Sequence, residues 1–322
     1  MSKQEIVNQY QESVKVKQIL KQIQLDKNQI QITNLVGSSM SFVISETFKK
    51  DDKSYLLILN DKEEAAYHLN DLEQLLDQKN VLFYPGSYRR PYQIEETDNA
   101  NVLMRSEVLN RINSRKKPTI IVTYPEALFE KVVTKKDLER NTLKLSVSES
   151  VSLDFVNEIL FEYNFNRVDF VTEPGDFSVR GGIIDVFSFS NDVPFRIEFF
   201  GDEIDSIRTF DVETQLSKEK LRKASIMSNV ENKTLQEKRE SFLQYIASNT
   251  VIFLKNKDLL IGKLDKLFDR AESAFSELSK ELNHARPIDL FCNGNFIQNQ
   301  LSDFRVASFE TYTSGDKPII DF

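Results

Sequence analysis

Two stretches of this sequence hold residue types at spacings that could support chemistry. The first is the small-residue turn 34–41, between an expected strand and an expected helix, where a phosphate-binding P-loop would lie. Such a loop needs G-x-x-x-x-G-K-[ST], because its backbone amides converge on phosphate and its lysine reaches the β- and γ-oxygens. Asn34 and Ser39 stand where the two glycines would be, and Met40 stands where the lysine would be. We therefore predict a degenerate loop of Asn34, Gly37, Ser39, Met40 and Ser41 that binds no nucleotide.

The second stretch, residues 176–211, combines alternating apolar residues with arginines and a pair of phenylalanines. One interpretation places Arg180, Arg196 and Phe200 together on an exposed face of neighbouring strands, because arginine and aromatic residues are common anchors of protein interfaces. The alternative is an ordinary sheet in which Phe200 belongs to the core. The arginines would then form cross-strand salt bridges with nearby carboxylates, namely Asp185, Glu198 or Asp202. Residue types alone leave both interpretations open.

Other reactive residue types form no convincing site. A basic aromatic patch could stack on DNA, although we favour an ordinary exposed loop for it. It comprises Tyr88, Arg89, Arg90 and Tyr92. Cys292 is the only cysteine and His68 and His284 are the only histidines, so the chain has neither an intramolecular disulfide nor the ligands of a Cys/His zinc site. We predict no cofactor and no metal.

The elements that would position these residues follow a two-part pattern. Before about residue 141 and after about residue 229, short buried strands alternate with helices, which is typical of a parallel sheet built from βαβ units. Between these parts, one helix is followed by closely spaced strands separated by turns, which predicts an antiparallel sheet. We expect one α/β domain made of 1–141 and 229–322, interrupted by an inserted α+β domain at 142–228.

Several bounds in this pattern can be checked. In the insert we expect a helix over 151–163 and then five strands, at 169–173, 176–180, 182–187, 194–200 and 203–211. Elsewhere the pattern predicts single helices over 4–24 and 234–247, and a strand over 288–291.

Composition narrows the classes of function. The 322 residues include 42 Lys and Arg against 50 Asp and Glu, a net charge of −8, so the chain as a whole repels a phosphate backbone. Nine Gly and eight Pro are few, which favours long regular elements. No stretch approaches the ~18 apolar residues of a membrane span, and we expect a cytoplasmic protein without a membrane partner.

The chain resembles the amino-terminal region of the Mfd family of bacterial transcription-repair coupling factors, which is itself similar to UvrB of nucleotide excision repair. Two blocks carry this resemblance, V-R-G-G-I-I-D-V-F at 179–187 and P-F-R-I-E-F-F-G-D-E-I-D-S-I-R-T-F-D at 194–211. Upstream, F-Y-P at 83–85 and T-Y-P-E-A-L at 123–128 also match. The resemblance covers essentially the whole chain in order, with specific motifs in the two blocks and weak ones elsewhere.

The resemblance implies an incomplete α/β domain of the RecA or P-loop-NTPase type, split around an inserted, UvrB-like domain that docks onto UvrA. Arg180, Arg196 and Phe200 match the positions that face UvrA in the family. The implied function is to recruit UvrA as a mimic of UvrB, linking stalled transcription to nucleotide excision repair without hydrolysing nucleotide.

Two departures from UvrB, which the family shares, accompany this interpretation. Met40 replaces the Walker lysine, and the segment after Tyr84 is too short for the DNA-clamping hairpin of UvrB. The resemblance implies that RNA polymerase, double-stranded DNA and an ATP-dependent translocase belong to downstream domains, so we expect a fragment of a longer protein.

Two other functions compete with recruitment. One is an ATP-dependent repair enzyme resembling UvrB or a helicase, against which Met40 and the acidic balance argue. The other is a stand-alone DNA-binding module, for which a sequence pI near 5.1 is unfavourable.

Overall fold

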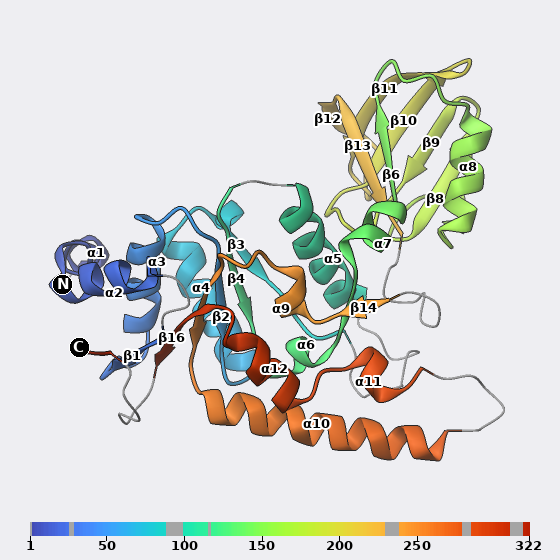
Figure 1. Ribbon diagram of the computed structural model, residues 1–322. Coiled ribbons are helices and arrows are strands. Elements are labelled where there is room, and N and C mark those ends of the chain that lie inside the picture. Colours follow the sequence, from blue (N-terminus) through green and yellow to red (C-terminus); the bar gives the residue numbers. More distant parts are fainter. Residues whose placement is uncertain are drawn as a thin grey trace. The chain divides into compact units, whose positions relative to one another are not determined.

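A computed structural model of the chain describes residues 2–25, 29–87, 99–114, 117–228, 238–278, 285–309 and 318–322 (Figure 1). The chain forms two compact units. The first unit comprises 1–93, 114–132 and 239–322, and the second comprises 94–113 and 133–238.

The first unit is built on a parallel sheet that has seven strands among the described residues, in the order β17-β1-β16-β15-β2-β4-β3. All neighbouring strands in it run parallel. Its central strands β2, β4 and β15 are buried along their whole length, as expected for a parallel sheet covered on both faces. The strands are β1 (Gln29–Thr33), β2 (Tyr55–Ile58), β3 (Val81–Phe83), β4 (Ile120–Thr123), β15 (Val251–Leu254), β16 (Arg305–Phe309) and β17 (Ile319–Asp321).

The first unit also contains helices, and several of them begin at a side-chain cap. Asp61 accepts a hydrogen bond from the Glu64 amide at 2.8 Å where α4 begins. Gly294 allows α12 to approach α10, because a Cβ at this position would lie 2.7 Å from the carbonyl oxygen of Ile261. The helical segments are α1 (Lys3–Glu12), α2 (Val14–Ile23), α3 (Ser39–Phe48), α4 (Lys62–Leu75), η1 (Gln78–Asn80), α6 (Pro125–Phe129), α9 (Phe242–Tyr245), α10 (Lys257–Glu277), α11 (Pro287–Leu290) and α12 (Gly294–Leu301).

Three predicted elements of this unit differ from the structure. The helix expected over 4–24 is two helices, because Ser13 ends α1 and caps α2 with its side chain. The strand expected over 288–291 is wrong, since Pro287 begins the single helical turn α11. Only Phe242–Tyr245 is helical among the described residues of 234–247, and a capping box of Ser241 and Gln244 begins that helix.

The second unit is built on a sheet that has six strands among the described residues, in the order β12-β11-β10-β9-β8-β7. All its neighbours are antiparallel except β7 and β8. A separate antiparallel pair joins β6 to β13. The elements are α5 (Asn99–Ser114), α7 (Lys135–Arg140), β6 (Thr142–Ser146), α8 (Leu153–Glu162), β7 (Asn166–Arg167), β8 (Asp176–Arg180), β9 (Ile183–Val186), β10 (Phe195–Phe200), β11 (Glu203–Phe210), β12 (Ser217–Leu221) and β13 (Lys223–Met227). The short strand β5 (Val132–Val133) lies at the boundary of the two units, and β14 (Arg239–Glu240) belongs to the first.

One predicted strand of this sheet is wrong. Residues 169–173 are a loop, because the Asp176 carboxylate accepts hydrogen bonds from the amides of Thr172 and Glu173 at 3.2 and 3.1 Å. These amides are the donors that a strand would use, so the segment forms a turn before β8.

The predicted fold class is confirmed, with a large parallel sheet and a separate antiparallel sheet. Strands from both ends of the chain build the parallel sheet, since β15 lies between β16 and β2. The boundaries near 142 and 228, and independent folding between them, stay predictions.

Candidate functional site

The two faces of the six-stranded sheet carry different side chains. One face packs against Val156 and Leu160 of α8. Its inward side chains are Phe177, Val179, Ile184, Val186, Phe195 and Ile197. Arg180, Arg196 and Phe200 occupy the alternate positions of β8 and β10, so they lie on the opposite face, here called the outer face.

Asp185 is the buried centre of the outer face, with 1% of its surface exposed. Arg196, directly opposite on β10, donates from Nε to Oδ1 at 2.7 Å and from Nη2 to Oδ2 at 2.9 Å. Arg180 donates from Nη2 to Oδ2 at 2.5 Å. One carboxylate therefore holds both guanidinium groups, and the three side chains together carry one net positive charge.

Arg196 is held by further contacts, and only 15% of its side chain is exposed. Its Nη1 donates to the carbonyl oxygen of Gln215 at 3.1 Å, and its guanidinium carbon lies 4.6 Å from the ring centroid of Phe210. The hydrogen bond with Asp185 raises the pKa of Arg196 above its ordinary value, although burial opposes this rise. This guanidinium is therefore a fixed, permanently charged group.

Arg180 is the more accessible of the two arginines, with 44% of its side chain exposed. Its guanidinium carbon lies 5.5 Å from the ring centroid of Phe170, a cation–π arrangement. The ion pair with Asp185 and this ring fix the guanidinium while leaving part of it accessible to a partner.

Phe200 ends β10 and is 84% exposed. A β-bulge lies at Glu198 and Phe199, and Phe199 packs against the core instead. The Phe199 amide donates to the Gly182 carbonyl at 2.8 Å, which places the end of β10 beside the turn that follows Arg180. A Cβ at Gly182 would lie 3.0 Å from the carbonyl oxygen of Phe199, so glycine keeps this turn close to β10.

The observed positions of these three side chains test both interpretations of the second stretch, and each interpretation is right in part. Among the three carboxylates considered, Asp185 pairs with both arginines, whereas Glu198 pairs with Arg208. Phe200 is exposed, so its assignment to the core is wrong.

Sequence reasoning missed the neighbours of the arginines, namely Phe170, Gln215 and Leu216. Phe170 lies in a loop that we expected to be a strand, and Gln215 and Leu216 lie in the turn between β11 and β12. Loop residues have no periodicity, and nothing in their spacing could have identified them.

The P-loop-like segment follows β1 at the carboxyl edge of the parallel sheet. Asn34 and Gly37 adopt positive φ values of 61° and 55°. The Asn34 side chain donates to Asp321 Oδ1 at 2.5 Å, and the Ser39 hydroxyl donates to the Val36 carbonyl at 2.6 Å. The polar side chains of Asn34 and Ser39 are therefore bound to other groups of the protein.

Met40 and Ser41 are buried in the first turn of α3. The Ser41 hydroxyl lies 2.7 Å from Nδ1 of His68, which is also buried. Burial, together with the positive charge of Lys255, lowers the pKa of His68 to about 4, so its imidazole is neutral at pH 7. An apolar core residue therefore stands where a P-loop lysine would reach phosphate.

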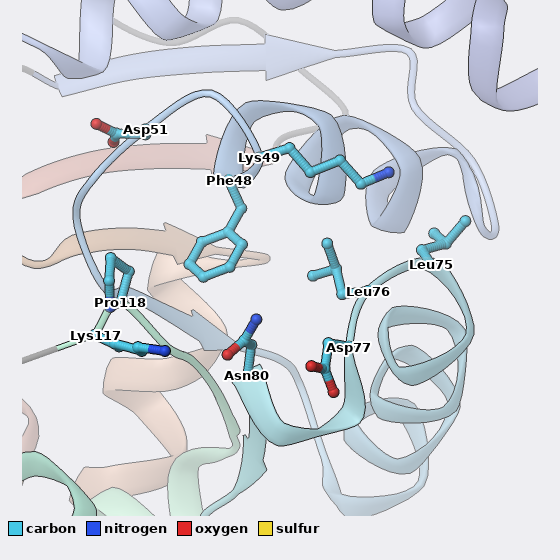
Figure 2. A pocket seen from close by; sticks show the side chains of 9 residues that line it. All are labelled: Phe48, Lys49, Asp51, Leu75, Leu76, Asp77, Asn80, Lys117 and Pro118. Carbon is cyan, nitrogen blue, oxygen red and sulfur yellow. The ribbon is translucent and has the colours of Figure 1, made fainter. Parts of the chain in front are cut away.

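A cavity of about 470 Å³ lies at the opposite, amino edge of the parallel sheet. Figure 2 shows the Phe48 ring and Leu76 beside this cavity, with Asp77 and Asn80 at its rim. Its position, before β2, β3 and β4, separates it from the loop at 34–41. No residue of the predicted nucleotide loop or of the predicted docking surface lines it.

The described residues contain no cluster of His, Cys, Asp and Glu that could hold a metal ion. None of their helices has the length and apolar character needed to cross a membrane. The basic aromatic patch at 88–92 and His284 lie outside the described residues.

Residues 143–231, in the second unit, match the family described as the UvrB interaction domain. The chain is also similar to transcription-repair-coupling factors. It is 31% identical to the factor of Bacillus subtilis (strain 168) over 196 residues, which cover 61% of this chain and 16% of that relative. It is 34% identical to the factor of Staphylococcus haemolyticus (strain JCSC1435) over 202 residues, 61% of this chain and 17% of that relative. The matched residues thus span about a sixth of the length of these relatives. The resemblance to this family is confirmed over 61% of the chain, which is less than the whole-chain resemblance that we expected.

Proposed function

We propose that the chain recruits UvrA through the outer face of its second unit, with Arg180, Arg196 and Phe200 as anchors. The match to the UvrB interaction domain and the similarity to transcription-repair coupling factors support this partner. In the longer protein, the interaction would link stalled transcription to nucleotide excision repair in the cytoplasm. RNA polymerase, double-stranded DNA and ATP-driven translocation would belong to other domains.

The exposure of Phe200 beside two fixed arginines is the observation that carries this proposal. An aromatic ring that is 84% exposed contributes little to the fold, but it can bury much of its surface in a partner. Because Asp185 already orders the guanidinium groups, docking costs less side-chain entropy than with free arginines.

We also propose that the chain neither binds nor hydrolyses nucleotide. The burial of Met40 supports this proposal, because the loop then has no lysine to balance a triphosphate. A calorimetric titration with ATP and Mg²⁺ tests it, and saturable heat at micromolar nucleotide would refute it.

Binding of the 322-residue chain to immobilised UvrA tests the recruitment proposal. Replacing Arg180, Arg196 or Phe200 by alanine should each cost about 2 kcal/mol or more, roughly thirtyfold in affinity. Phe155→Ala on α8 and Arg222→Ala, both at exposed positions of the same unit, serve as matched controls and should bind like the parent. A parent chain that fails to bind UvrA would overturn the proposal, as would equal binding by all three anchor variants.

A further inference from the structure

Two exposed apolar side chains of the second unit belong to loops that contact the arginine pair. Phe170 is 60% exposed and Leu216 is 68% exposed. Large apolar groups held at such exposure beside fixed cations are typical of an interaction surface. Phe170 contacts Arg180, and Leu216 follows Gln215, which binds Arg196.

Phe170 lies on the Arg180 side. Its ring stacks with the Arg180 guanidinium at 5.5 Å, and Arg180 ends β8 just before the turn that contacts β10. The hydrogen bond between the Phe199 amide and the Gly182 carbonyl brings Phe200 to the same end of the sheet. Phe170 and Phe200 therefore provide apolar surface around Arg180.

Leu216 lies on the Arg196 side. Gln215, just before it, accepts the Arg196 Nη1 hydrogen bond with its carbonyl oxygen at 3.1 Å. The turn is well held, because the Gln215 amide donates to the Asp211 carbonyl at 2.8 Å and the Asp211 amide donates to the Leu216 carbonyl at 3.0 Å. Leu216 is thus presented by an ordered turn that is tied directly to one of the arginines.

We infer that Phe170 and Leu216 are two further contacts of the UvrA docking surface. They lie on neighbouring loops, which the hydrogen bond from Gln215 Nε2 to the Val171 carbonyl joins at 3.4 Å, and they extend the surface beyond the arginine pair on the side away from Phe200. This inference rests on the proposed function. The net positive charge of Arg180, Asp185 and Arg196 would pair with a carboxylate on UvrA. Phe200 on one side, and Phe170 and Leu216 on the other, would pack against apolar surface of UvrA that flanks this carboxylate. The surface is therefore an apolar, cationic, apolar row.

The test measures association and dissociation rates of the 322-residue chain on immobilised UvrA. Phe170→Ala and Leu216→Ala should each weaken binding about tenfold, mostly through faster dissociation. Leu216→Met, which keeps an apolar side chain, should bind like the parent. Phe155→Ala and Leu259→Ala remove exposed apolar groups elsewhere and should change nothing. Unchanged melting temperatures should accompany all these variants.

The failures of this inference and of the proposed function are distinguishable. If the parent does not bind UvrA, the proposed function fails. If Arg196→Ala weakens binding while Phe170→Ala and Leu216→Ala do not, only this inference fails. A double-mutant cycle separates contact from positioning: the loss from Phe170→Ala should persist in the Arg180→Ala background. Its disappearance there would mean that Phe170 merely orients Arg180, and would overturn its assignment as a contact.

Discussion

Replacing Asp185 by asparagine perturbs the outer face at its centre. The substitution preserves shape but removes the negative charge that accepts three hydrogen bonds from two guanidinium groups. The amide has one oxygen acceptor, and its NH₂ group would face arginine donors. Two cations would then lie close together without a counter-charge.

The two ion pairs differ in their contribution to stability. Arg196 is largely buried, and breaking a buried pair by removing one partner costs about 3–5 kcal/mol. Arg180 is 44% exposed, so its pair contributes at most about 1 kcal/mol after screening by solvent. Because Arg196 retains its bond to the Gln215 carbonyl, we expect a loss near the lower limit, about 3 kcal/mol. Urea unfolding followed by circular dichroism measures this loss.

Asp185→Asn should also weaken UvrA binding, because the two arginine side chains lose the carboxylate that orders them. Ordering a long side chain at an interface costs about 0.5–1.5 kcal/mol, so freeing two arginines predicts a loss of about 1–3 kcal/mol. Removing a negative charge opposes this loss by speeding association, but salt near 0.15 M screens charges beyond about 8 Å. We therefore expect dissociation to accelerate about tenfold, with little change in association.

A matched control is Asp205→Asn, which neutralises an exposed carboxylate on the neighbouring strand β11. It should leave both stability and binding within error of the parent. The reasoning would be refuted if Asp185→Asn unfolded at the same urea concentration as the parent and left UvrA at the same rate.

Other predictions concern the first unit and the domain boundaries. Because the pKa of His68 is about 4 when folded and about 6.5 when unfolded, its contribution to stability is complete above pH 6.5 and is lost as pH falls toward 4. Urea unfolding at pH 7.5 and 4.5 should therefore show a loss roughly 2–3 kcal/mol larger for the parent than for His68→Gln; equal losses would contradict this cause. Met40→Lys buries a charge and should destabilise the chain by several kcal/mol without creating ATP binding in calorimetry; a stable, ATP-binding variant would disprove it. Burial raises the pKa of Cys292 to about 12, so a thiol reagent at pH 8 should label it only after denaturation; fast labelling of the native chain would contradict its burial. Residues 142–228 expressed alone should give dispersed NMR resonances, and a spectrum of an unfolded chain would argue against these boundaries.

The sequence allows the sheets to be predicted better than their connections. The buried runs at 55–58 and 120–123 and the alternation at 176–180 are strong signals, because burial on two faces or on one face leaves a distinct pattern. The errors arise where one side chain redirects the backbone. Ser13 divides a helix, Pro287 begins a helical turn, and Asp176 takes the amide donors of an expected strand.

The candidate site was only partly predictable for the same reason. The arginines and Phe200 belong to regular strands, so alternation could place them on one face. The sharing of Asp185 by both arginines depends on strand register, which the sequence left open among three carboxylates. Phe170 and Leu216 lie in loops, whose side-chain directions depend on hydrogen bonds that no periodicity encodes.

The order of strands in the parallel sheet also determines when each strand can pair with its neighbours during synthesis. Gln29 of β1 pairs with Val306 of β16, so β1 lacks this neighbour until another 277 residues have been made. At about 5–20 residues per second, this takes about 14–55 s, during which the edge of β1 needs protection from wrong partners. The antiparallel strands of the second unit, in contrast, pair within a short stretch of chain and can form as they leave the ribosome. The second unit should therefore fold first during synthesis. A ribosome-associated chaperone should protect mainly the strands of the parallel sheet.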